Sequence, residues 1–324
     1  NIEKVLKTMK KRYNGEYIFK LSGEEPDLAK RELESIVSGS CKAVDEFRKI
    51  IMTTEECEQP KRLSMTQEVA KIIHRGLREG IGDLTLDEGL KGSYAVRKDC
   101  VEPGIKLEKD MESKIGNILS NRNNHVDLDN PETIIKAYIL EDEIILGRLE
   151  QEIDRGKFNQ RKNQNRSFSS PVSLDPKLAR TLVNLSGVKP GERLLDPFCG
   201  TGGILIEAGL CGVGVAGTDI DQEMVKGCRK NLEQYGIINH DIRQESAEKA
   251  PEAFDKEFDA IVTDLPYGRS SKKTKDIVEK FMNSIKAYDC RKVIMWNKDT
   301  LDGRNPDFSI DVHSSLTRYI FIID

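Results

Sequence analysis

Residues 258–268, FDAIVTDLPYG, bring together side chains that can handle an amino group on an aromatic base. The apolar residues 260–262 are typical of a buried parallel strand. Pro266 cannot extend that strand, because proline has no N–H to donate to a sheet ladder. Asp264, Pro266 and Tyr267 therefore follow the carboxyl end of a strand, where open α/β sheets bind their ligands.

The chemistry that suits this stretch is methylation of an exocyclic amine, a poor nucleophile because its lone pair is delocalised into the ring of the base. Asp264 and the carbonyl oxygen of Leu265 can each accept a hydrogen bond from the amine and so aim its lone pair. Tyr267 offers a ring face on which a flipped-out base can stack. A β-turn with a packed tyrosine is the simpler interpretation, so the motif needs support from elsewhere in the chain.

A glycine-rich stretch upstream, residues 196–203 with the sequence DPFCGTGG, predicts a cofactor loop between a strand and a helix. Gly200, Gly202 and Gly203 allow the backbone to approach a ligand closely, with the helix N-terminus facing it. Asp196 is unusual before a pyrophosphate loop, but its carboxylate suits a cationic cofactor that carries an amino-acid ammonium group. Asp219 ends the next predicted strand and is placed to accept hydrogen bonds from ribose hydroxyls.

Strands and helices alternate through residues 173–324, which predicts an α/β fold with a doubly wound, Rossmann-like sheet. The expected strands are 193–195, 213–218, 241–245, 260–262 and 292–296, with helices at 178–185, 204–210, 222–235 and 274–287. Residues 308–312 and 318–323 are expected to form a hairpin at one edge of the sheet. That hairpin favours a methyltransferase over a dehydrogenase.

The N-terminal half predicts two smaller α+β domains, at residues 1–55 and 56–150. In the first, a strand at 16–21 precedes a helix at 27–37. In the second, we expect a helix at 61–80, a strand at 92–99, a helix at 110–119 and a hairpin over 134–149. A polar segment, residues 151–172, is expected to be an extended basic linker to the last domain.

The basic residues of this linker stand between a binding part and a catalytic part of the chain. A solvated linker and a track for phosphates are both open interpretations. The candidate phosphate contacts are Arg155, Lys157, Arg161, Lys162 and Arg166. Arg269, Lys272 and Lys273 follow the DLPY stretch and are further candidates for nucleic-acid contact.

Composition limits the class of protein. The chain has 324 residues, of which 33% are charged and 37% hydrophobic, as in a globular protein of two or three domains. The net charge of −4 excludes a global basic field, so any nucleic-acid site must be local. Seven scattered cysteines without metal-ligand spacing indicate reduced thiols. We expect a cytoplasmic monomer without a metal or a membrane segment.

Three motifs, LLDPFCGTGG, TDID and TDLPYGR, resemble those of class I S-adenosylmethionine-dependent methyltransferases that methylate amino groups. The whole chain resembles the archaeal tRNA guanosine-10 N2-methyltransferases. This resemblance implies an N-terminal ferredoxin-like domain, a THUMP domain that holds the 3′ end of tRNA, and a Rossmann-like methyltransferase domain. It also implies transfer of one or two methyl groups from S-adenosylmethionine to N2 of a guanosine in tRNA, with position 10 expected.

The resemblance also implies roles for particular residues. The catalytic set is Asp264, Leu265, Pro266 and Tyr267. The cofactor set is Asp196, Pro197, Cys199, Gly200, Gly202, Gly203, Asp219, Ile220, Ser246 and Ala247. Ser246 departs from the family pattern, because many relatives place an aspartate there to hold the adenine amino group.

Two other functions stay open. The same DLPY chemistry serves methylation of adenine N6 or guanine N2 in DNA or ribosomal RNA, so the motif does not choose the substrate. A non-catalytic RNA-binding protein with a degenerate fold is the alternative from another class. The intact acids Asp196, Asp219 and Asp264 speak against it.

Overall fold

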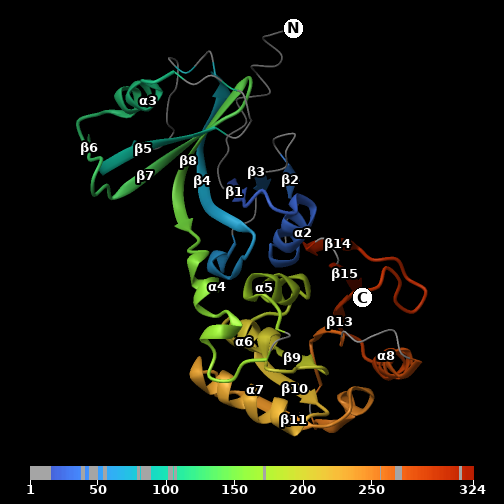
Figure 1. Cartoon of the computed structure of the whole chain (residues 1–324). Helices are drawn as coiled ribbons and strands as arrows, with labels where there is room; N and C mark the ends of the chain where they lie inside the picture. The colour runs from blue at the N-terminus through green and yellow to red at the C-terminus, as the bar shows by residue number, and fades with distance from the viewer. Residues whose placement is uncertain are drawn as a thin grey trace. The chain divides into compact units, whose positions relative to one another are not determined.

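The computed structural model describes residues 16–37, 41–43, 50–53, 57–78, 81, 89–100, 105, 108–170, 173–255, 257–266, 272–313 and 316–324. The chain forms two compact units (Figure 1). The first comprises Asn1–Lys61 and Met65–Asp154, and the second comprises Arg62–Ser64 and Arg155–Asp324.

The first unit is built on one sheet with the strand order β2-β3-β1-β4-β8-β7-β5-β6. Its elements are β1 (Tyr17–Leu21), α2 (Pro26–Ile36), β2 (Lys42–Ala43), β3 (Ile50–Thr53), β4 (Thr66–Leu77), β5 (Gly92–Cys100), α3 (Met111–Leu119), β6 (Asn124–Val126), β7 (Thr133–Ile139) and β8 (Glu143–Glu152). The predicted helices at 27–37 and 110–119 and the hairpin over 134–149 are confirmed. The expected domains 1–55 and 56–150 share this one sheet, because β1 of the first pairs with β4 of the second.

The helix predicted at 61–80 is wrong, since most of that stretch is strand β4. Along β4, Thr66, Glu68, Ala70 and Ile72 are buried at every second position, as expected for a strand, and Val69 between them is buried as well. Two of those four buried residues are polar, which hid the alternation in the sequence. Burial of Glu68 is possible because its carboxylate accepts a hydrogen bond from Tyr138 at 2.9 Å and pairs with Lys136.

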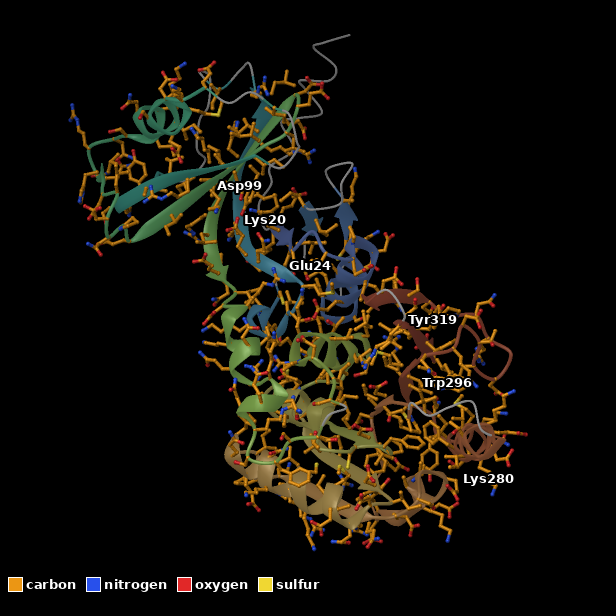
Figure 2. The ribbon with its side chains drawn as sticks, in the orientation of Figure 1. Lys20, Glu24, Asp99, Lys280, Trp296 and Tyr319 are labelled. Carbon is orange, nitrogen blue, oxygen red and sulfur yellow. The ribbon has the colours of Figure 1, made fainter. Side chains whose placement is uncertain are left out.

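The sheet of the first unit is strongly curved. Lys20 on β1 forms an ion pair with Asp99 on β5, although β4, β8 and β7 lie between these strands in the sheet order (Figure 2). Four steps between strands would separate the two residues by about 19 Å in a flat sheet. The ion pair therefore requires the sheet to coil, as the natural twist of strands allows.

The second unit confirms the predicted doubly wound sheet, with the order β11-β10-β9-β12-β13-β15-β14. Its elements are α4 (Gly156–Gln160), α5 (Pro176–Leu185), β9 (Arg193–Asp196), α6 (Gly203–Gly209), β10 (Gly214–Asp219), α7 (Gln222–Gln234), β11 (His240–Gln244), β12 (Ala260–Asp264), α8 (Lys272–Ile285), β13 (Arg291–Trp296), β14 (Phe308–His313) and β15 (Leu316–Ile323). Strands β9 to β13 are parallel, and β15 pairs antiparallel with both β13 and β14. The edge hairpin expected of a methyltransferase is thus present; Figure 2 labels Trp296 and Tyr319, which are paired across β13 and β15.

Local sequence explains where the helices of this unit begin. Asp175 caps α5 by accepting a hydrogen bond from the Lys177 N–H at 2.9 Å, and Pro176 occupies the first turn. Asp221 caps α7 in the same way through the Glu223 N–H. Capping side chains satisfy backbone donors that the first helical turn leaves without partners.

The segment after β8 is folded, so the prediction of an extended linker is wrong. Residues 156–160 form α4, and Asn163–Asn165 form a short 3₁₀ turn. Phe158 is buried, with the guanidinium groups of Arg161 and Arg180 over its ring. Both arginines also pair with Glu207 of α6, whose side chain is fully buried. The buried ring and this ion-pair cluster fix the segment against α5 and α6.

The short segment Arg62–Ser64 belongs to the second unit although its flanking residues belong to the first. Arg62 is buried and donates from Nε to Oδ1 of Asn184 and from Nη2 to the carbonyl of Val188, both at 2.8 Å. The Asn184 side chain donates back to the Arg62 carbonyl at 2.9 Å. Ser64 and Thr181 share a hydroxyl hydrogen bond of 2.8 Å. Residues distant in sequence thus complete the buried surface of α5.

Candidate active site

Three carboxylates end three neighbouring strands of the second unit. Asp196, Asp219 and Asp264 are the last residues of β9, β10 and β12. These strands are parallel and adjacent in the order β10-β9-β12, so the three side chains start from one edge of the sheet. The structure therefore brings together the acids that the sequence assigned to the cofactor and to catalysis.

The glycine loop after β9 has one crowded side and one open side. Gly202 has φ 84°, and a Cβ added to it would lie 2.7 Å from Sγ of Cys228. Both the left-handed backbone and this contact require glycine. A Cβ on Gly200 would meet nothing within 4 Å, while the Gly200 N–H donates to Oδ2 of Asp219 at 3.0 Å. The open side at Gly200 leaves room for a ligand next to Asp219.

The other predicted loop residues connect this loop to β10 and α6. The Cys199 N–H donates to the carbonyl of Thr218 at 2.9 Å, and the Thr218 hydroxyl donates to the carbonyl of Pro197 at 3.0 Å. Cys199 is buried, in keeping with a packing role. Gly203 is the first residue of α6. These contacts fix the course of the loop.

Asp196 lies beneath the loop and is only 2% exposed. Its Oδ1 accepts hydrogen bonds from the hydroxyl of Thr263 at 2.7 Å and from the Phe198 N–H at 3.1 Å. Burial raises the pKa of the Asp196 carboxyl to about 7, and the nearby carboxylates of Asp264 and Asp219 add to the rise. The edge thus concentrates negative charge, which a bound cation would stabilise.

The end of β10 offers both a polar and an apolar group to a nucleoside. Oδ1 of Asp219 accepts from the Asp221 N–H and Oδ2 from Gly200, but each carboxylate oxygen can accept a further hydrogen bond. The next residue, Ile220, is 76% exposed, which is unusual for a large apolar side chain. Two ribose hydroxyls and a flat ring would satisfy these two groups.

Ser246 follows β11 and can contribute to the same site. Its hydroxyl donates to Oε1 of Glu245 at 3.2 Å, so the hydroxyl oxygen keeps lone pairs for a donor on a ligand. An adenine amino group is such a donor. The neighbouring Ala247 is buried in the core beside α8.

The donor set therefore fits S-adenosylmethionine. Carboxylates at Asp196 and Asp219 suit a molecule with an ammonium, a sulfonium and two ribose hydroxyls, and the exposed Ile220 suits an adenine face. A pyrophosphate would instead face two carboxylates at close range, which like charge opposes.

The candidate catalytic turn follows β12. Leu265 is fully buried, and its N–H donates to the carbonyl of Met295 at 2.9 Å, which fixes this peptide at the end of the sheet. Pro266 is exposed. Oδ2 of Asp264 lies 3.4 Å from Nη1 of Arg318 on β15. Tyr267 lies outside the described residues, so its stacking role stays a prediction.

Two residues of the site escaped the sequence analysis. Thr263, which contacts Asp196, directly precedes Asp264 and could have been found as a hydroxyl beside the motif. Arg318 contacts Asp264 from 54 residues away, and no local signal in the sequence points to it. Only the place of β15 next to β13 brings it to this edge.

The predicted phosphate contacts of the linker differ in exposure. Lys157 is exposed, and Arg155 and Lys162 are partly exposed. Arg161 pairs with Glu207, and Arg166 is buried, donating to the Arg161 carbonyl and to the Ser173 hydroxyl. Arg269 lies outside the described residues, as do the side chains of Lys272 and Lys273. Among the linker residues, Lys157 and Lys162 are best placed to meet phosphates.

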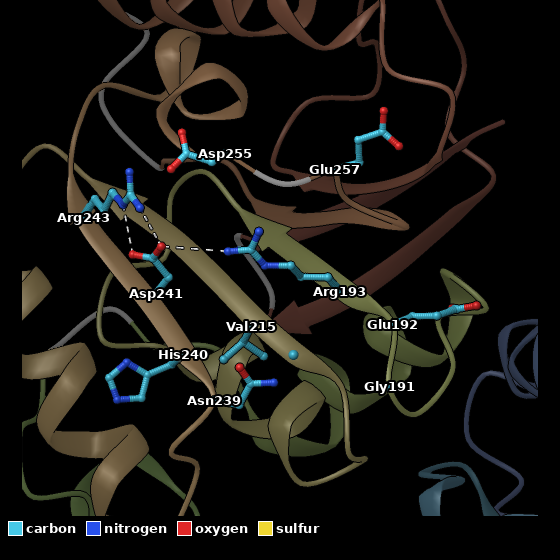
Figure 3. Close-up of a pocket in the computed structure, with 11 residues that line it drawn as sticks. Gly191, Glu192, Arg193, Val215, Asn239, His240, Asp241, Arg243, Asp255 and Glu257 are labelled. Carbon is cyan, nitrogen blue, oxygen red and sulfur yellow. Dashed lines mark hydrogen bonds and ion pairs between the residues drawn. The ribbon is translucent and has the colours of Figure 1, made fainter.

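A cavity of about 470 Å³ lies at the opposite end of the strands from the three carboxylates (Figure 3). It is lined by residues at the starts of β9, β10 and β11, including Arg193, Val215 and Asp241. Arg243 and Arg193 both lie near Asp241, which pairs with Arg243 at 2.7 Å. The cavity is thus separated from the carboxylate edge by the length of the strands.

Within the described ranges, no helix is long and apolar enough to span a membrane. In the same part of the chain, no three or more His, Cys, Asp or Glu side chains are arranged so that they could hold a metal ion.

Comparison with known proteins identifies the family of the chain. Residues 163–298 match the model of the RMKL-like methyltransferase domain. A tRNA (guanine(10)-N2)-dimethyltransferase of Methanothermobacter thermautotrophicus is 36% identical over 94% of this chain and 98% of its own length. Its namesake from Pyrococcus abyssi is 33% identical over 95% of this chain and 99% of its own length.

A solved structure shares the fold. The crystal structure of TrmN from Thermus thermophilus superposes with a TM-score of 0.52 at 20% identity, covering 95% of this chain and 98% of that one. Identity above 30% along nearly the whole length of both chains shows common descent with the archaeal enzymes. The chain therefore belongs to the family of archaeal tRNA (guanine(10)-N2)-dimethyltransferases.

Proposed function

We propose that the protein transfers methyl groups from S-adenosylmethionine to the exocyclic N2 amine of a guanosine in tRNA, with position 10 as the expected target. The observation that carries this proposal is the place of Asp264. It ends the strand next to β9, which itself ends at Asp196 under the cofactor loop. The full-length similarity to guanine(10)-N2 dimethyltransferases supports tRNA as the substrate.

When bound, S-adenosylmethionine supplies an electrophilic methyl group on its sulfonium sulfur. Asp264 and the Leu265 carbonyl would accept hydrogen bonds from N2 and hold its lone pair toward that methyl group. Once the methyl group has passed from sulfur to nitrogen, N2 would carry one proton too many, and the Asp264 carboxylate would accept that proton. Thr263 keeps Asp196 and the catalytic strand in register by its hydrogen bond.

Binding of tRNA requires basic groups outside the carboxylate edge. We assign phosphate contact to Lys157 and Lys162 and to three residues after the catalytic turn, Arg269, Lys272 and Lys273. To the first unit we assign a THUMP-type role, which is to hold the acceptor end of tRNA. Whether one or two methyl groups are transferred depends on whether the catalytic turn can bind an N2 amine that already carries one methyl group. We expect the protein to act as a monomer in the cytoplasm, where tRNA is found.

The test is methylation of defined substrates. The protein is incubated with radiolabelled S-adenosylmethionine and, separately, with unmodified tRNA transcripts, ribosomal RNA and duplex DNA. We expect label in tRNA only, and mass spectrometry of the digested tRNA should find N2-methylguanosine or N2,N2-dimethylguanosine. A transcript with adenosine at position 10 serves as the matched control.

Other outcomes of this test favour other functions. Label in DNA or ribosomal RNA alone would replace tRNA by that substrate and leave the amine chemistry intact. Calorimetry that detects tRNA binding but no cofactor binding would indicate a non-catalytic RNA-binding protein.

A further inference from the structure

Arg318 is placed to act on the candidate catalytic acid. It lies at the start of β15, the strand that runs antiparallel to β13. Asp264 is opposite Met295 on β13, and Met295 is opposite Ile320 on β15. Arg318 precedes Ile320 by two residues, so its side chain emerges on the same face of the sheet as that of Asp264. The arginine therefore reaches Asp264 across the end of β13.

The contact between Arg318 and Asp264 is largely shielded from solvent and lies beside other acidic groups. Arg318 is 8% exposed, and its Nη1 lies 3.4 Å from Oδ2 of Asp264, whose side chain is 17% exposed. Screening by solvent is weaker here than at the protein surface. The neighbouring strands β9 and β10 end in two further carboxylates, Asp196 and Asp219. A guanidinium beside Asp264 therefore offsets the repulsion among three acids.

We propose that Arg318 is a positioning residue that holds the Asp264 carboxylate in the orientation needed to accept the N–H of the target amine. The proposal rests on the function proposed above. A carboxylate can accept about four hydrogen bonds, so contact with Arg318 is compatible with contact to an amine. The guanidinium fixes the rotation of the carboxyl group, which an unrestrained side chain would lose in solvent.

A role in stabilising the transition state itself is excluded by charge. Methyl transfer moves positive charge from sulfur to the attacking nitrogen, and a cation next to that nitrogen would oppose the change. The contribution of Arg318 must therefore come through Asp264. Its effect should be seen in turnover and in pH dependence, and not in the binding of tRNA.

The experiment compares Arg318→Met and Arg318→Lys with the wild-type protein in steady-state methylation of tRNA. Methionine keeps an apolar stem and removes the charge. We expect kcat to fall by about 10- to 100-fold, because the catalytic carboxylate is misplaced. The KM for tRNA should stay within a factor of two of the wild-type value. The acidic limb of the kcat profile should move to higher pH, because the carboxylate loses its opposite charge. Lysine should restore the pH limb and only part of kcat, since ammonium lacks the planar fork of arginine.

Arg291→Met is the matched control. Arg291 also pairs with a carboxylate, that of Asp324, but at the opposite end of β13. The control loses the same charge in the same sheet and should keep the wild-type kcat and pH profile. Circular dichroism and cofactor affinity by calorimetry check that each variant is folded.

A double-mutant comparison shows whether Arg318 acts through Asp264. In an Asp264→Asn background, Arg318→Met should change kcat by less than twofold, because the group it positions has lost its charge. Wild-type activity in Arg318→Met, equal losses in both backgrounds, or an unmoved pH limb would each overturn the inference. Absence of tRNA methylation by the wild-type protein would instead refute the proposed function.

Discussion

The hydroxyl of Thr263 on β12 donates a hydrogen bond of 2.7 Å to Oδ1 of Asp196 on β9. One residue after Thr263 stands the candidate catalytic acid, and one residue after Asp196 begins the cofactor loop. This contact joins the cofactor loop to the strand that carries the candidate catalytic acid. Loss of the hydroxyl should therefore be felt at the cofactor loop as well as on β12.

Stability without cofactor should depend on the ionisation of Asp196. The pKa of its carboxyl is raised from 3.8 to about 7, so the folded protein binds more protons than the unfolded chain between these values. The free energy of unfolding should therefore decrease as the pH rises toward 7, and Asp196→Asn should remove this decrease. Urea unfolding at pH 5, 6, 7 and 8 measures it. Thr263→Val, which removes a hydrogen bond that lowers this pKa, should extend the decrease to higher pH. Parallel profiles for all three proteins would contradict the prediction.

Removal of the candidate catalytic carboxylate should separate catalysis from cofactor binding. We expect Asp264→Ala to lower kcat by about 100- to 1,000-fold, as for loss of a positioned polar group, while the Kd for S-adenosylmethionine stays nearly the same. Asp259→Ala is the control, because Asp259 precedes the opposite end of the same strand and is exposed. Equal loss of cofactor binding and of kcat would mean that Asp264 has a structural role.

Gly202 should tolerate no side chain, for two reasons that can be measured separately. Gly202→Ala places a Cβ in a left-handed backbone and against Cys228, whereas Gly236→Ala meets only the first problem, with φ 70° and nothing within 4 Å. We expect ~1–2 kcal/mol of destabilisation for Gly236→Ala and more for Gly202→Ala. Adding Cys228→Ala to Gly202→Ala should recover part of the difference. Denaturant unfolding checks all four proteins, and equal values for the two glycine variants would argue against the collision.

The ion pairs of Glu207 should contribute to stability. Its buried carboxylate contacts both Arg161 and Arg180, so Glu207→Gln leaves two guanidinium groups without their counter-charge. We expect a loss of ~3–5 kcal/mol in the free energy of unfolding. Glu223→Gln is the control, because its pair with Lys226 is exposed and should matter by about 0.5 kcal/mol or less. A small loss for Glu207→Gln would show that the segment after β8 is held mainly by Phe158.

Lys157 and Lys162 should contact phosphates of tRNA. Charge reversal at each should weaken tRNA binding and reduce the slope of log K against log salt by about 1. The reversal Lys226→Glu on α7 changes the net charge equally and should leave the slope unchanged. Filter binding at four salt concentrations measures the slopes. Unchanged slopes for both linker variants would identify this segment as structural only.

The sequence predicted those parts of the site that lie close together along the chain. Asp196 with its loop and Asp264 with Leu265 and Pro266 are short motifs, and the alternation of apolar runs predicted the strands before them. Arg318 was missed because its contact depends on which strand lies next to β13, which is a property of the whole sheet. Strand β4 was missed because the buried Glu68 is compensated by Tyr138, a partner 70 residues away. Burial of polar groups becomes visible only with their partners.

The docking of Arg62–Ser64 on α5 has a consequence for protein synthesis and for engineering. Arg62 is synthesised long before Asn184, its partner 122 residues later in the chain. Residues 62–64 are therefore already present when α5 is made and packs against them. A fragment that begins at Arg155 lacks that segment and would remove the hydrogen bonds that Arg62 makes with Asn184 and Arg180. A workable catalytic fragment would have to be supplied with the missing tripeptide region, either fused through a short loop or added as a separate peptide.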